Sequence, residues 1–80
     1  MLLQYIRAAM RQAKYEILEE DGTYYGEIPA LQGVFANADT LEECRDMLEE
    51  ILGEWILLNV ADGIPLPAVG EVELVLRKAA

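Results

Sequence analysis

GEIPALQG at residues 26–33 and NADTLEEC at residues 37–44 carry the strongest local signals for the fold of this chain. Pro29 has no amide hydrogen to donate to a strand ladder, so it is expected to end an apolar strand. Thr40 followed by Glu43 has the spacing of a capping box and predicts the start of a helix. The short apolar segment over 33–38 is expected to form a strand between them. The two stretches therefore predict a strand, a turn, a second strand and a helix, in that order.

The residues before these stretches predict a β-hairpin. Asp21-Gly22 is the pair favoured for a two-residue type I′ turn, here between segments 14–20 and 23–28. That turn sets a register in which the core-facing pairs are Ile17 with Gly26, Tyr15 with Ile28, and Glu19 with Tyr24. The other face would pair Leu18 with Tyr25 and Glu16 with Glu27, although two opposed carboxylates are unfavourable in isolation. Gly26 leaves a side-chain gap, which a helix is expected to approach closely.

Two amphipathic helices and a last strand complete the prediction. Apolar side chains recur at helical spacing over residues 2–13, and Arg7 and Arg11 lie on the other side of that helix. The second helix is expected to run from 41 to 61, because Gly63 suits a C-terminal cap and Pro65 prevents continuation. Residues 71–77 alternate as a strand would. The predicted buried stripe of the second helix consists of Leu41, Cys44, Leu48, Ile51, Leu52, Trp55 and Leu58.

The resulting fold class is α+β, with the order α-β-β-β-α-β and helices covering one face of the sheet. The sheet should be antiparallel, because the connections between strands are too short for crossovers. We expect a single domain over residues 1–80. A domain of this size has a small core, yet 54% of its residues are apolar. We therefore expect a homo-oligomer, either a dimer or a higher even number.

Composition and charge argue against several functions. Six basic residues against fifteen acidic ones give a net charge of −9, which disfavours direct nucleic-acid binding and favours a basic partner. The chain has no histidine and no serine, so a Ser-His or Cys-His nucleophile cannot come from one chain. No apolar run is long enough for a membrane span. We expect a cytoplasmic protein with no cofactor and no enzymatic activity.

Cys44 is the chain's one cysteine, so it cannot form an internal disulfide. Without histidine it does not supply the usual ligands of structural zinc. We expect Cys44 to be a small buried hydrophobic residue.

The candidate binding residues form two groups. Glu42, Asp46, Glu50 and Glu54 follow one another at i+4 along the second helix, where like charges repel. They are either a solvated face or an anionic ridge that engages basic groups. Leu18 and Tyr25 form an apolar patch, typical of a protein contact, on the second face of the hairpin. Glu16 and Glu27 on that face leave open a divalent metal site, with no residue that fixes its geometry.

Residues 15–67 resemble the HicB family of antitoxin-like domains. The resemblance rests on the Pro-hydrophobic-Gly turn at 29–33 and the acidic-Thr-Leu-Glu-Glu helix start at 39–43. It implies a partial RNase H-like core, β-β-β-α-β, here with an added N-terminal helix. It also implies a protein that binds and neutralises a small basic HicA-like toxin, an mRNA-cleaving ribonuclease. Many members add a DNA-binding helix-turn-helix module, but the thirteen residues after Pro67 are too few for one.

Two other functions remain open. One is a stand-alone oligomeric binding domain with an unknown ligand and no toxin partner. The other is a metal-dependent nuclease, which needs acidic residues gathered around metal ions. The predicted register disfavours the nuclease, because it places Glu16 and Glu27 on the face opposite Glu19.

Overall fold

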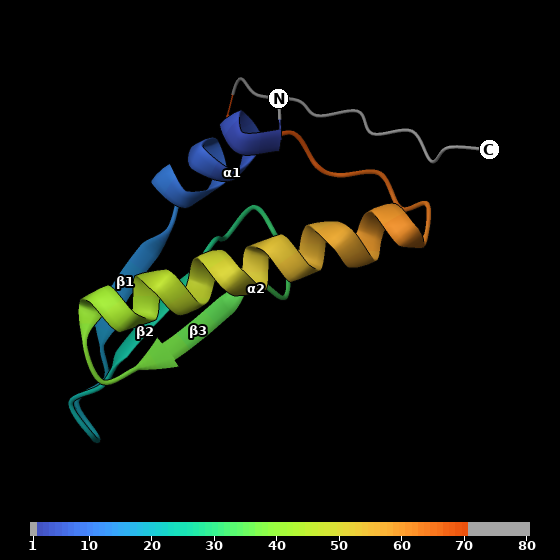
Figure 1. The fold of residues 1–80 in the computed structure, drawn as a ribbon. Coiled ribbons are helices and arrows are strands. Elements are labelled where there is room, and N and C mark those ends of the chain that lie inside the picture. Colours follow the sequence, from blue (N-terminus) through green and yellow to red (C-terminus); the bar gives the residue numbers. More distant parts are fainter. Residues whose placement is uncertain (1, 71–80) are drawn as a thin grey trace.

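The computed structural model describes residues 2–70 and shows a helix, three strands and a long helix (Figure 1). The strands form one antiparallel sheet in the order β1-β2-β3. α2 packs on one face of the sheet, and α1 lies past the end of the sheet beside α2 (Figure 1). The α+β prediction is confirmed for this part, whereas the predicted strand over 71–77 lies outside the described residues. The elements are α1 (Leu2–Arg11), β1 (Lys14–Ile17), β2 (Tyr24–Glu27), β3 (Phe35–Ala38) and α2 (Leu41–Ala61).

The hairpin between β1 and β2 exists, but its predicted register is wrong by two residues. The ladder closes at Leu18, whose N–H donates to the Thr23 carbonyl at 2.8 Å, so the loop spans residues 19–22. A type I′ turn needs a positive φ at both of its central residues. Gly22 has a φ of +72°, but no described residue other than glycine has a positive φ, so Asp21-Gly22 does not form a type I′ turn. Asp21 Oδ1 instead accepts hydrogen bonds from the Thr23 N–H at 3.0 Å and the Thr23 hydroxyl at 2.7 Å. The aspartate therefore holds the loop through its side chain.

The shift of register removes the predicted clash of carboxylates. Glu16 lies opposite Tyr25, and Glu27 lies between Lys14 and Phe35. A shift of two residues keeps the side chains of the paired strands on their predicted faces, because side chains alternate along a strand. Two residues predicted to face the core do not reach it: Glu19 lies in the exposed loop, and Ile17 is 59% exposed at the end of β1. Gly26, Ala36 and Tyr15 face α2. We call the other side the outer sheet face; it carries Lys14, Glu16, Tyr25, Glu27, Phe35 and Asn37.

The bounds predicted for α2 are confirmed, and both ends have local causes. The Thr40 hydroxyl oxygen accepts the Glu43 N–H at 3.1 Å and donates to Glu43 Oε1 at 3.1 Å, so these two residues cap the N-terminus. At the other end Gly63 has a φ of +70°, and the Ile64 N–H donates to the Asn59 carbonyl at 2.8 Å. This is the hydrogen bond of a Schellman motif, which ends the helix.

The buried stripe of α2 differs from the predicted stripe at its two ends. Leu41 and Leu58 are exposed, whereas Ile56, which the prediction omitted, is buried. The fully buried side chains of the stripe are Cys44, Leu48, Leu52 and Ile56, with Ile51 and Trp55 half-buried against them. Because 21 residues make a helix of about 31 Å and a four-residue strand spans about 13 Å, α2 extends past the sheet. Leu58 lies on that extension, half a turn from Ile56.

The buried face of α1 is also narrower than predicted. Leu2 and Leu3 are exposed, whereas Tyr5, Ala8 and Ala9 are buried. The Tyr5 hydroxyl donates to the Pro67 carbonyl at 2.6 Å, which ties the segment after α2 to the first helix. Among the described residues no helix is long and apolar enough to cross a membrane.

Candidate functional site

The acidic ridge, defined as Glu42, Asp46, Glu50 and Glu54, lies on the solvent side of α2. Each ridge residue lies two positions along the helix from a buried residue of the stripe. Two positions correspond to about half a helical turn. All four side chains are exposed. The ridge therefore points away from the sheet, and the structure keeps these four carboxylates together as the sequence predicted.

The outer sheet face presents an aromatic pair. The rings of Tyr25 and Phe35 are stacked, with centroids 6.2 Å apart and an angle of 29° between their planes. Phe35 is 54% exposed. Burial, and then the negative charges of Glu27 and Glu16, raise the pKa of Tyr25, so both carboxylates lie near its hydroxyl. Leu18 is on the same face, but it lies opposite Thr23 and only diagonal to Tyr25.

The two predicted groups of binding residues do not form one site. α2 covers the inner face of the sheet, and the acidic ridge lies on the far side of α2. Tyr25 and Leu18 lie on the outer sheet face, on the other side of the molecule. A compact partner that contacts the ridge therefore cannot contact Tyr25 of the same chain.

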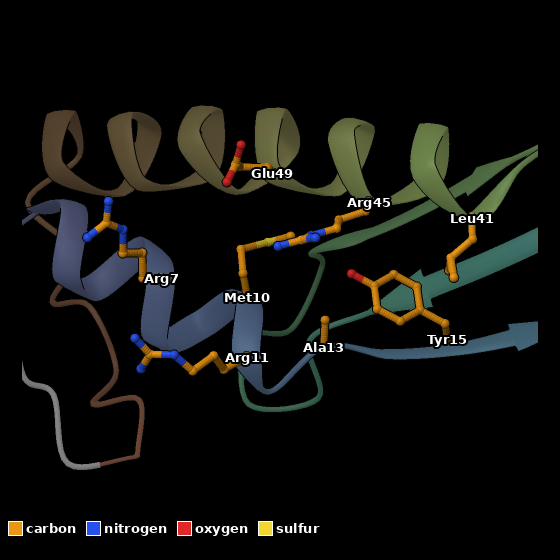
Figure 2. A pocket seen from close by; sticks show the side chains of 8 residues that line it. All are labelled: Arg7, Met10, Arg11, Ala13, Tyr15, Leu41, Arg45 and Glu49. Atoms are coloured by element: carbon orange, nitrogen blue, oxygen red, sulfur yellow. The ribbon is translucent and has the colours of Figure 1, made fainter.

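A third surface was not predicted as a site. It is a hollow of about 490 Å³ between α1, the start of β1 and the first half of α2 (Figure 2). Figure 2 shows Arg7 and Arg11 on α1, and Arg45 on α2 near Met10. We call it the arginine-lined groove; its lining residues are Arg7, Met10, Arg11, Ala13, Tyr15, Leu41, Arg45 and Glu49.

Arg45 and Tyr15 interact electrostatically in the arginine-lined groove. Burial raises the pKa of Tyr15, and the positive charge of Arg45 opposes that rise, so the guanidinium and the phenol interact. Within residues 2–70 none of the three arginines forms an ion pair with a carboxylate. The i+4 spacing of Arg7 and Arg11 was visible in the sequence, but only the packing of α1 on α2 adds Arg45 to them.

Within residues 2–70 the structure forms no cluster of three or more metal ligands, and its one cysteine lies inside the core. No group of three or more carboxylate or cysteine side chains there could hold a metal ion. Glu16 and Glu27 are not the opposed pair that the predicted register required. Cys44 is fully buried, as predicted, and burial raises the pKa of its thiol, which disfavours the reactive thiolate.

Comparison with known proteins identifies the family. Residues 4–67, most of the chain, match the UPF0150-like family. This chain belongs to the UPF0150-like family. The family is related to the HicB-like antitoxin fold, so the resemblance drawn from the sequence is confirmed at the level of the fold.

A solved structure of similar sequence supports the fold of this UPF0150-like chain. The crystal structure of TTHA0281 from Thermus thermophilus has 39% sequence identity and a TM-score of 0.89, over 96% of this chain and 95% of that chain. A comparison with curated proteins gave no match. The arrangement of α1, the sheet and α2 is therefore shared with another protein of nearly the same extent.

Proposed function

We propose that this chain is an antitoxin-type protein that binds and neutralises a small, basic, HicA-like mRNA-cleaving toxin. The observation that carries the proposal is the acidic ridge of α2, displayed on a fold related to HicB-like antitoxins. Four exposed carboxylates at i+4 repel one another along the helix. A basic partner would relieve that repulsion, and a toxin that cleaves mRNA needs basic groups to hold its substrate.

The ridge and the outer sheet face would have different tasks in this proposal. Electrostatic attraction acts mainly on the association rate, while apolar contacts set the residence time. We assign the ridge to attraction of the toxin. We assign the outer sheet face, with Leu18, Tyr25 and Phe35, to apolar contact with a second copy of the chain, since one compact toxin cannot contact both surfaces of one copy. The proposed role is binding, with no catalytic step of its own.

Charge reversal on the ridge tests the proposal. The first step is to identify the toxin, through a small basic histidine-containing protein encoded in the adjoining reading frame or captured from native extract. The double variant Asp46→Lys, Glu50→Lys should then associate with it at least about tenfold more slowly at low salt. Its fold should remain, because the change also relieves repulsion along α2. Stopped-flow fluorescence measures the rate.

A control variant with the same change of net charge tests whether the position of the charges matters. The variant Glu19→Lys, Glu20→Lys alters the exposed hairpin loop by the same charge and should slow association much less. If the ridge variant associates with the toxin at the wild-type rate, the ridge is only a solvated face. Equal slowing by both variants would mean that net charge, and not the ridge, attracts the partner.

A second function is a stand-alone oligomeric binding domain without a toxin partner. The observation that favours it is the exposure of large apolar side chains on α2 and β3. Leu57 and Leu58 are 68% and 66% exposed, in addition to Phe35. Absence of a basic protein both from the adjoining reading frame and from the captured material would favour this function over the first.

A further inference from the structure

We propose that the arginine-lined groove binds a small organic dianion of the phosphate-monoester class. This inference is separate from toxin binding, because none of the acidic-ridge residues lines the groove. The acidic chain as a whole repels anions, so the local charge of this one hollow must decide whether an anion binds.

The distribution of positive charge in the chain supports an anion site. Of six basic residues, Arg77 and Lys78 lie outside the described part, which leaves Arg7, Arg11, Lys14 and Arg45. Three of these four line the groove. The lining contains one carboxylate, Glu49, so its formal charge is +3 − 1 = +2. A dianion would neutralise this charge.

The size of the groove and its apolar wall favour an organic anion over an inorganic ion. A hollow of about 490 Å³ is within the size range of sites for small molecules. Met10, Ala13 and Leu41 give it an apolar wall, which would contact the carbon part of a ligand. The guanidinium groups come from two helices and lie apart, with Arg45 beside Met10 and with Arg7 and Arg11 extending away from it (Figure 2). To share one anion, they would have to turn toward it. Tyr15 adds a hydroxyl donor.

Phosphate is the anion that three arginines suit best. Each planar guanidinium can donate two parallel hydrogen bonds to phosphate oxygens. A phosphate monoester carries a charge of about −1.5 to −2 at neutral pH, which matches the charge of the lining. A nucleic-acid strand is disfavoured, because a chain of net charge −9 repels the further phosphates that such a strand carries.

Titration of the full chain with phenyl phosphate, followed by the amide signals in two-dimensional NMR, tests the proposal. We expect saturable shifts confined to α1 and the first half of α2, at millimolar probe or below. Inorganic phosphate should bind more weakly, because it lacks the apolar part. Arg45→Gln and, separately, Arg7→Gln should each weaken binding at least about tenfold, a change of about 1.4 kcal/mol.

Lys14→Gln is the matched control, since it removes the same charge but lies on the outer sheet face. It should leave the affinity within about twofold of wild type. Circular dichroism checks that each variant keeps its helices. The proposal is overturned if phenyl phosphate gives no saturable shifts, or if Lys14→Gln weakens binding as much as Arg45→Gln. Succinate binding as tightly as phenyl phosphate would overturn the choice of phosphate.

Discussion

The ring of Tyr15 lies against the main chain of Gly26, its cross-strand partner. A Cβ atom at residue 26 would be 2.8 Å from both Cδ1 and Cε1 of that ring and 3.1 Å from the Cys44 sulfur of α2. The gap predicted at Gly26 is confirmed, but a tyrosine from the neighbouring strand occupies it together with the helix. Tyr15 also lines the arginine-lined groove, so Gly26 supports one wall of that groove.

Replacing Gly26 with alanine should lower the free energy of unfolding by about 1–3 kcal/mol, because the ring of Tyr15 must move from a packed position. Urea unfolding measures the change. Gly53→Ala is the matched control: apart from its chain neighbours and the backbone of its own helix, no atom lies within 4 Å of its added Cβ, and it lies inside α2. The control should gain about 1 kcal/mol from helix propensity. Equal stability of the Gly26→Ala variant and wild type would contradict the packing described.

Tyr5→Phe should cost about 1 kcal/mol of stability, because the Pro67 carbonyl loses its donor at 2.6 Å. Hydrogen exchange should quicken at residues 68–70, which follow the carbonyl that Tyr5 holds. Tyr24→Phe is the control: within residues 2–70 its hydroxyl has no hydrogen bond, so its loss should change stability by no more than about 0.5 kcal/mol. A Tyr5→Phe protein with wild-type stability and exchange would show that this hydrogen bond does not hold the segment.

Cys44 should make stability fall at alkaline pH. Burial raises the folded-state pKa of its thiol above the ordinary value of 9.0. Its stabilising contribution is therefore complete below pH 9 and is lost as pH rises through the folded-state pKa. Denaturant titrations at a series of pH values should show a shallower alkaline loss for Cys44→Ala than for wild type. A thiol reagent should react with Cys44 only as fast as the protein unfolds; rapid reaction in the native state would contradict burial.

The protein should assemble into a dimer or a higher even-numbered oligomer through the outer sheet face. Phe35→Glu should shift the assembly toward monomer, because it places a charge on that face beside Glu27. Met47→Glu, at an exposed position of α2, is the control and should leave the assembly intact. Light scattering measures both. A particle of 9.0 kDa at high micromolar wild-type concentration would contradict this prediction.

The isolated protein should not bind duplex DNA or RNA at physiological salt, because its net charge of −9 repels phosphates. Gel-shift and fluorescence-anisotropy titrations at micromolar protein check this. Binding that weakens steeply with added salt would show that an oligomer gathers the basic residues of several copies into one surface.

Features that depend on neighbouring residues could be predicted from the amino-acid order alone. Thr40 and Gly63 mark the ends of α2, because a helix end needs a capping side chain or a residue with positive φ within one turn. Pro29 ends β2 because it has no amide hydrogen to donate to the sheet. The order of the described elements, the burial of Cys44 and the alignment of the acidic ridge along one helix follow from periodicity.

Features that depend on residues far apart in the chain became visible only in the folded molecule. Asp21-Gly22 permits a tight turn, but the cross-strand packing of the Tyr15 ring on Gly26 accompanies a register with a longer loop. The exposure of Leu58 follows from α2 being longer than the sheet it covers. Arg45 joins Arg7 and Arg11 because α1 packs on α2, and no local pattern encodes the proximity of segments so far apart in sequence.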